Sequence, residues 1–182
     1  FDSDERLVVF SSLSSSILYD FFIKTTGKQN LHELASLLPI PTLNPKLRNL
    51  LFSRTLSLNC LTTHYKELWK SLYSDKFRQD SWSKNDPRLR SWNLLTSDWK
   101  RDAPLRNDFE RRQALVEIDV LSALALNLTL TQLLVLYKIQ FPVLQENERR
   151  LRFDQHGMEV PVKTVGGEFG VDVNHPKYAK MV

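Results

Sequence analysis

The residues most able to do chemistry in this 182-residue chain are its single cysteine, its four histidines and a few spaced acids. Cys60 and His64 lie four residues apart in a segment predicted to be helical, which would place both side chains on one helix face. Protein zinc sites use three or four ligands, and no further histidine lies near this pair with ligand spacing. The pair therefore indicates a packed thiol beside a half-buried histidine, and we expect no metal site.

A second set of residues has the spacing of a nuclease signature. Asp86 precedes Asp98-Trp99-Lys100, and two-metal hydrolysis uses paired carboxylates with a lysine beside the phosphate. So short a pattern arises by chance in a chain rich in acids, and no predicted strands would hold these groups rigidly. A self-contained hydrolase is therefore the least favoured of three functional hypotheses. Glu117 and Asp119 point to different helix faces and are expected to be solvated or ion-paired.

The basic residues are distributed unevenly along the chain. The net charge is +4, from 25 basic and 21 acidic residues. Residues 42–112 carry an excess of +7, whereas residues 1–41 and 113–182 carry −2 and −1. A localised basic segment attracts polyanions, although the same charges can also form a solvated face. Three of the four tryptophans fall within residues 74–103, where they could stack on exposed bases or pin an irregular loop to the core.

Composition excludes several classes of protein. Apolar residues make up 42% and charged residues 25%, as in a folded globular chain rather than a disordered one. Only five glycines occur, which favours helices over a turn-rich β fold. A single cysteine permits no internal disulfide and fits a reducing compartment, and neither a membrane span nor a signal peptide is visible. We expect a cytoplasmic protein that does not enter membranes, and the start at Phe1 suggests a piece of a longer chain.

Capping residues and apolar spacing predict where the helices lie. Thr129 with Gln132 has capping-box spacing, and Asn44 followed by Pro45 is a typical helix start. Residues 74–103 are expected to form an irregular connection. The predicted helices span about residues 4–24, 30–38, 45–72, 104–127 and 130–141, with one or two more turns over 143–150 and a hairpin turn at 154–157. The sequence thus predicts a mainly α fold, an irregular helical domain of about five or six helices with a short β-hairpin near the C-terminus.

Three stretches resemble a known family. The run Leu13-Ser-Ser-Ser-Ile-Leu-Tyr-Asp-Phe-Phe-Ile-Lys-Thr-Thr-Gly-Lys, with Asn30-Leu-His-Glu-Leu and Leu37-Leu-Pro-Ile-Pro after it, resembles the target-recognition region of large adenine-specific DNA methyltransferases. These are the enzymes of type IIG restriction-modification and of bacterial phage-defence systems such as DISARM or BREX. Residues 54–69 and 111–144 are similar to the C-terminal helical part of the same proteins. The likeness covers roughly residues 10–150.

The resemblance implies a fragment that is not catalytic by itself. Such N6-adenine methyltransferases bind S-adenosylmethionine through a Gly-containing strand-loop motif and hold the flipped adenine with an Asn/Asp-Pro-Pro-Tyr/Phe motif. Neither motif occurs in this chain. S-adenosylmethionine would therefore belong to an upstream methyltransferase domain of the same polypeptide, and this chain would need no cofactor. Its implied parts are a target-recognition-like segment (1–41), a helical domain (42–150) with the basic connection 74–103, and a hairpin with an extended tail (151–182).

Double-stranded DNA is the partner that this interpretation implies. Basic residues of segment 42–112 would contact phosphates and set the register, while the turn around Gly27 would approach base edges. The residues predicted to bind DNA are Lys24, Lys28, Asn30, Arg48, Arg54, Arg88 and Arg90.

The alternative hypothesis is a helical protein-interaction module that docks other subunits of a defence or restriction complex. Its support is the strongly apolar helix from Leu130 to Phe141, in which Leu133, Leu134 and Leu136 leave little polar face. In that case the basic middle segment would serve solubility. The upstream sequence of the parent protein would discriminate the two, because it would either contain the methyltransferase motifs or lack them.

Overall fold

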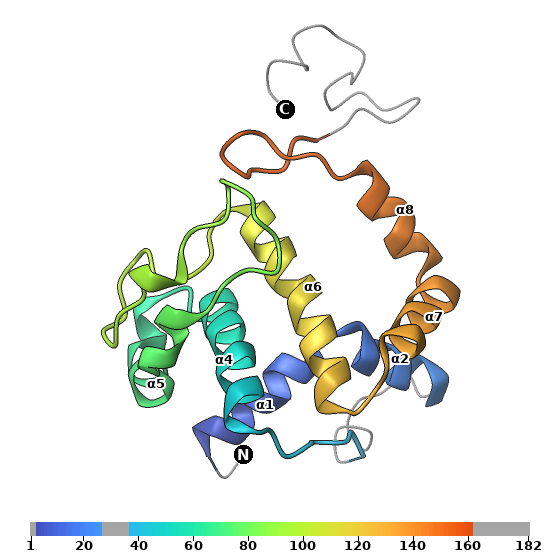
Figure 1. Cartoon of the computed structure of the whole chain (residues 1–182), viewed down its shortest axis with the longest axis horizontal. Helices are drawn as coiled ribbons and strands as arrows, with labels where there is room; N and C mark the ends of the chain where they lie inside the picture. Colours follow the sequence, from blue (N-terminus) through green and yellow to red (C-terminus); the bar gives the residue numbers. More distant parts are fainter. Residues whose placement is uncertain (1–2, 27–36, 162–182) are drawn as a thin grey trace, which may run out of the picture.

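The computed structural model describes residues 3–26 and 37–161 and is mainly helical, as predicted (Figure 1). Over these residues it has seven α-helices and no β-strand. The helices are α1 (Asp4–Ser14), α2 (Ile17–Thr26), α4 (Pro45–Asn59), α5 (Lys66–Leu72), α6 (Asp108–Ala125), α7 (Leu130–Gln140) and α8 (Pro142–Arg150). Short 3₁₀ helices lie at Thr63–Tyr65, Asp75–Gln79 and Trp92–Leu94.

The single helix predicted over about residues 4–24 is in fact two helices. α1 ends at Ser14, and α2 starts at Ile17 with its axis bent by 75° from that of α1. The Ser16 hydroxyl donates to the Leu13 carbonyl, and the Ile17 amide donates to a carboxylate oxygen of Asp119 at 2.8 Å. The Asp119 side chain of α6 therefore accepts the hydrogen bond of an amide that the bend leaves without a partner in its own helix. No local sequence pattern could reveal this contact, because the two residues are far apart in the chain.

The helix predicted over residues 45–72 is also interrupted. α4 begins as expected, with the Asn44 side chain accepting from the Leu47 amide and Pro45 at the first position. It ends at Asn59, because Cys60 leaves helical geometry and its carbonyl accepts a hydrogen bond from the Trp99 indole at 2.7 Å. The polar run that follows forms the 3₁₀ helix Thr63–Tyr65 before α5 begins.

The later elements follow the sequence more closely. α6 starts at Asp108, four residues after the predicted start at Pro104, and the Asn107 side chain caps it. It ends at Ala125, and Asn127, two residues further on, has a φ of 57°. The capping box of Thr129 and Gln132 at α7 is confirmed. At residues 154–157 the predicted turn is present, but it is flanked by one isolated bridge, Phe153 to Glu159, rather than by paired strands.

The core forms where α1, α4 and α6 meet, and the connection 74–103 covers one side of it (Figure 1). Trp69 and Trp92 are fully buried, and Trp82 stacks on Trp92 with ring centroids 4.5 Å apart. The indoles of Trp69, Trp82 and Trp99 each donate to a backbone carbonyl. The tryptophans therefore pin the connection to the helices, which was one of the two interpretations left open by the sequence.

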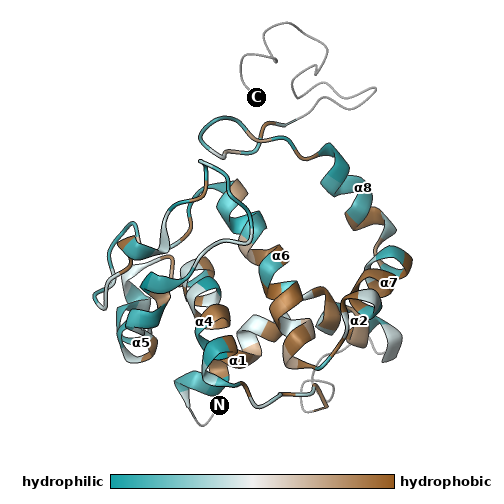
Figure 2. Cartoon of the chain, viewed as in Figure 1, coloured by the Kyte–Doolittle hydropathy of each residue, from teal (hydrophilic) through white to brown (hydrophobic). Residues whose placement is uncertain are grey.

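Helices α7 and α8 form an arm beside this core. α7 packs against α2 and α6, and α8 packs against α7 and is tied to α6 by the ion pair between Arg112 and Glu148. Figure 2 shows hydrophobic residues along α7 and on the half of α6 nearest to it. Within the described residues no single helix could cross a membrane by length and apolarity; α1 and α2 would pass that test only as a bent pair.

Candidate nucleic-acid interface

Two of the seven residues predicted to bind DNA, Lys28 and Asn30, lie outside the described residues. Lys24 is exposed in the last turn of α2, pairs with Asp20 at 2.7 Å and lies over the Phe141 ring at 4.6 Å. It faces the α7 arm, on a different element from the four predicted arginines. The structure therefore does not bring Lys24 together with them.

Arg48 lies near the start of α4 and is held by its neighbours. Its Nε donates to a Glu5 carboxylate oxygen at 2.6 Å, and its guanidinium lies 4.4 Å from the Phe52 ring centroid. About a quarter of the side chain (26%) stays exposed. Arg48 can thus still bind a phosphate if it releases Glu5. The cost in free energy is modest, because an exposed ion pair contributes little to stability.

Arg54 is buried, with only 3% of its surface exposed. Its Nη1 donates to Asp80 at 2.6 Å and its Nε to Glu117 at 2.5 Å, while further donors reach the carbonyls of Leu50 and Ser81. A guanidinium with its donors so engaged presents nothing to a phosphate. We therefore remove Arg54 from the candidate contacts and assign it to holding the connection against α4 and α6.

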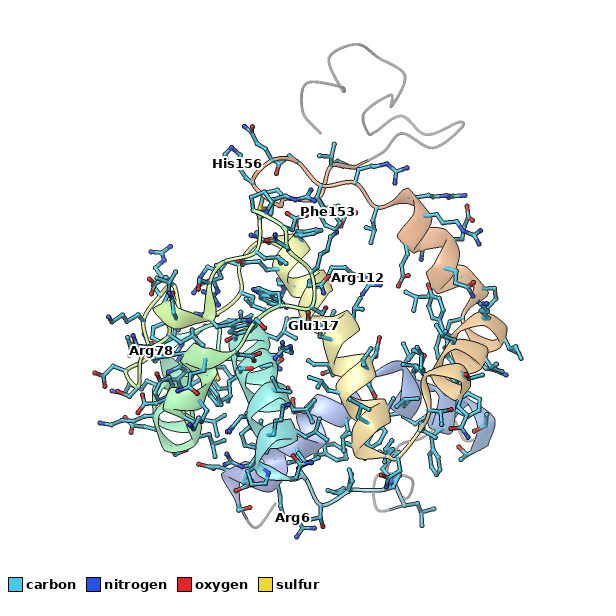
Figure 3. The ribbon with its side chains drawn as sticks, viewed as in Figure 1. Arg6, Arg78, Arg112, Glu117, Phe153 and His156 are labelled. Atoms are coloured by element: carbon cyan, nitrogen blue, oxygen red, sulfur yellow. The ribbon has the colours of Figure 1, made fainter. Side chains whose placement is uncertain are left out.

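Glu117 is the acceptor on the other side of this ion-pair network (Figure 3). Besides Arg54, its carboxylate accepts from the Ser83 amide at 2.8 Å, the Ser83 hydroxyl at 2.6 Å and the Gln113 amide at 2.9 Å. Burial alone would raise the pKa of Glu117, but Arg54 and these hydrogen bonds outweigh it and place the pKa below the ordinary value. Of the two states predicted for Glu117, solvated or ion-paired, the structure shows the ion-paired one.

Arg88 and Arg90 are also engaged within the chain. Arg88 forms a two-bond pair with Asp86, with both N to O distances at 2.9 Å, and its hydrogen bond lowers the pKa of Asp86 to about 2. Arg90 donates to the carbonyls of Asp102 and Ala103, and burial lowers its pKa. Arg88 keeps 24% of its side chain exposed, and Arg90 is half-buried with its terminal donors on backbone carbonyls, so Arg88 is the better placed of the two to bind a phosphate.

An open groove of about 500 Å³ lies where the start of α4 meets the 3₁₀ helix Asp75–Gln79. Lys46 and Asn49 line it from α4, and Lys76 and Gln79 line it from the connection. Both lysines are exposed, and neither has an ion-pair partner among the residues that the structure describes. We call this the lysine groove.

The start of α4 adds to the positive potential of the lysine groove. The amino end of a helix carries a partial positive charge, and acids in the first turn normally offset it. The first turn of α4 has no acid and instead carries Lys46. Sequence reasoning passed over Lys46 and Lys76 individually; the signal that could have found Lys46 is its place directly after the predicted helix start at Asn44-Pro45.

A second pocket, of about 280 Å³, adjoins the lysine groove and shares Leu50, Asp80 and Ser81 with it. We call it the Trp82 pocket. Its apolar lining comes from Trp82 and from Val116, Val120 and Leu121 of α6, and its polar lining comes from the Arg54 network, Ser81 and Ser83. The two pockets together form a continuous surface over one side of α4.

The other chemical hypotheses find little support in the geometry. Cys60 is buried at the end of α4, where burial raises the pKa of its thiol to about 12, and His64 is exposed in the following 3₁₀ helix. The two therefore do not share a helix face. Across residues 3–26 and 37–161 no three His, Cys, Asp or Glu side chains come together as metal ligands. Asp86 is ion-paired with Arg88 and Lys84.

The helix from Leu130 is as apolar as predicted, and much of it is exposed. Leu130 and Ile139 of α7 are 65% and 66% exposed, and only Leu133 of this helix is buried. Val143, at the start of α8, is 72% exposed. A groove of about 350 Å³ runs between α7 and Phe21 of α2.

Comparison with known proteins identifies no relative of this chain: no family model, no curated protein and no solved structure matches it.

Proposed function

We propose that this chain holds duplex DNA and takes part in target recognition, as a non-catalytic C-terminal part of an N6-adenine-specific DNA methyltransferase or restriction-modification enzyme. The observation that supports the proposal best is the lysine groove. It combines two exposed cations, the positive end of a 15-residue helix and two side-chain amides on one surface. Cations and helix amino ends bind phosphates, and the amides of Asn49 and Gln79 can bond to base edges or sugars.

The distribution of the remaining charges agrees with this assignment. Arg54 is buried and ion-paired, so it adds little to the positive surface potential of segment 42–112, but most other cations of the segment are exposed. The exposed ones are Lys46, Lys66, Lys70, Lys76, Arg78, Lys84, Lys100, Arg101 and Arg106. Cations on the surface of a basic segment steer a polyanion toward it, whereas only those that contact phosphates set the salt slope of binding. Arg48 and Arg88, each partly exposed, extend the proposed contact area, whereas Lys28 and Asn30 stay predictions from the sequence.

The proposed role needs a partner for the chemistry. S-adenosylmethionine and the target adenine would be bound by an upstream methyltransferase domain, since the chain lacks both motifs. Such a protein would act in a bacterial cytoplasm, in restriction-modification or phage defence.

Fluorescence anisotropy of a labelled random-sequence duplex, titrated across salt concentrations, tests the proposal. We expect the logarithm of the affinity to fall linearly with the logarithm of the salt concentration, with a slope that corresponds to several released counterions. Absence of binding at low salt by a folded sample would overturn the proposal for this chain.

A second candidate function, protein docking, is favoured by the exposed apolar residues of α7 and of Val143. Large apolar side chains in such number on one helix are typical of a contact surface. The upstream domain of the same polypeptide is the partner we propose, and a double change Leu134→Lys with Ile139→Lys tests it. The pair should prevent association with that domain supplied in trans and leave duplex binding unchanged; unimpaired association would exclude this surface.

A further inference from the structure

The Trp82 pocket has the features of a ligand site rather than of a packing defect. At about 280 Å³ it lies just under the roughly 300–1,000 Å³ of sites that hold small molecules, which suits a single ring system. Such sites combine apolar walls with a few convergent polar groups. Here Trp82, Val116 and Val120 supply apolar lining, and the polar groups belong to the Arg54 network.

The walls of the pocket are held in place. Trp82 stacks on the buried Trp92, and its indole donates to the Arg90 carbonyl at 2.8 Å, so the ring has little freedom to turn. Val116 and Val120 belong to the middle of α6 and are 36% and 41% exposed. The Arg54 guanidinium lies 5.8 Å from the Trp82 ring centroid, so the part of the ring that lines the pocket lies beside the two exposed valines and the Arg54 network. A fixed aromatic ring and two valines in one pocket suit a flat, apolar group that has a polar edge.

The charge of the pocket selects which edge fits best. Asp80 and Glu117 together carry −2 and Arg54 carries +1, so the floor has a net charge of −1. The Ser81 side chain also reaches the pocket and is exposed. An exocyclic amino group at the edge of a ring is favoured by this floor, whereas an edge with two carbonyl oxygens and no amino group is favoured less.

The position of the Trp82 pocket next to the lysine groove indicates the kind of ligand to which such a ring belongs. Lys46, Leu50 and Arg54 follow one another at four-residue steps along α4, which spans about 12 Å from the first to the last. Leu50, Asp80 and Ser81 line both pockets. An anionic group beside the lysines and a flat base beside Trp82 are two parts of one ligand, a nucleotide within a strand.

We propose that the Trp82 pocket accepts one unstacked, amino-bearing base, that is any base except thymine, of a DNA strand whose phosphate lies in the lysine groove. This inference rests on the proposed function and adds to it a site for a single base.

Binding of single strands tests the pocket directly. The probes are labelled homopolymers of deoxyadenosine, deoxycytidine and deoxythymidine, twelve nucleotides each, measured by anisotropy with the whole chain at fixed salt. We expect the adenine and cytosine strands to bind at least about fivefold more tightly than the thymine strand, because a thymine base left outside the pocket forgoes the stacking contribution, whose low end is about fivefold. Quenching of tryptophan fluorescence should accompany their binding.

Val120→Phe fills the pocket and should abolish this preference while leaving the affinity for the thymine strand unchanged. Val135→Phe is the matched control, because Val135 is a similarly exposed valine on α7, away from the pocket. Should Val120→Phe fail to fold, Val116→Phe fills the same pocket from one turn earlier.

The outcomes separate this inference from the proposed function. If the duplex binds but the three strands bind alike, or if Val120→Phe keeps the preference, the base pocket is overturned and the proposed function stands. If neither duplex nor single strands bind at low salt, both are overturned.

Discussion

Replacing Arg54 by Met tests the role of the buried ion-pair network in stability. Met keeps most of the volume and the apolar stem of arginine but removes its charge, which leaves Asp80 and Glu117 without their cation. The side chains of all three residues are at most 7% exposed. Removal of one partner from such a buried network costs about 3–5 kcal/mol, because an uncompensated charge remains in the interior.

The expected loss is large for a chain of this size. A change of 1 kcal/mol shifts the melting temperature of a domain of 150–250 residues by about 2–4 °C, so Arg54→Met should lower it by about 6–20 °C. Urea unfolding at pH 7 should show the same loss as a shifted midpoint with an unchanged slope. Arg48→Met is the matched control: its partner Glu5 is 51% exposed, and this pair should be worth less than about 1 kcal/mol.

The pH dependence provides a second check on the same variant. In the native chain the pKa of Glu117 is depressed, so the network contributes stability above the unfolded pKa of Glu117 and loses it as the pH falls through the folded value. Without Arg54, burial would instead raise that pKa. The difference between wild type and Arg54→Met should therefore shrink as the pH falls toward 4.

A triple variant separates charge from packing. Arg54→Met combined with Asp80→Asn and Glu117→Gln removes all three charges and should be more stable than Arg54→Met alone, because no uncompensated carboxylate remains. A loss below about 1 kcal/mol in the single variant, or a triple variant less stable than the single one, would refute the reasoning.

Two further predictions concern single positions. Burial raises the pKa of Asp119 to about 6, so ionisation of this side chain costs stability as the pH rises from about 4 to above 6. Asp119→Asn keeps an oxygen that accepts from the Ile17 amide, and it should stabilise the chain by about 1–3 kcal/mol at pH 7.5 and by almost nothing near pH 4. Thermal unfolding at both pH values checks this, and equal effects at the two would contradict it. Gly157 has φ of 80°, and a Cβ there would lie 2.9 Å from the Asn107 side chain, so Gly157→Ala should cost about 1–2 kcal/mol in urea unfolding; an unchanged midpoint would show that the turn relaxes freely.

Local chemistry allowed much of the fold to be predicted. The caps at Asn44 and Thr129 and the end of α6 at Ala125, near the predicted stop at Asn127, depend on residues within one turn of each other. The breaks after Ser14 and Asn59 were missed. They are stabilised by Asp119 and Trp99, which are distant in sequence, so apolar spacing alone continued each helix through its break.

The candidate site was less predictable for the same reason. Counting charges located the basic segment, but it could not tell that Arg54 would meet Glu117, 63 residues away, or that Arg90 would bind carbonyls of its own connection. Arginine is a phosphate ligand and equally a partner for buried carboxylates, and only the tertiary arrangement decides between them. Lysines, which seldom become buried, retained their exposure at residues 46 and 76.

The salt dependence of duplex binding by a lysine-groove variant tests the central claim most directly. Lys46→Ala with Lys76→Ala should lower the slope of log affinity against log salt by about 1.8, which is the loss of two phosphate contacts. Lys66→Ala with Lys70→Ala, on α5, removes the same charge outside the groove and should change the slope much less. Equal slopes for the two double variants would show that net charge alone attracts DNA and would contradict an interface at the lysine groove.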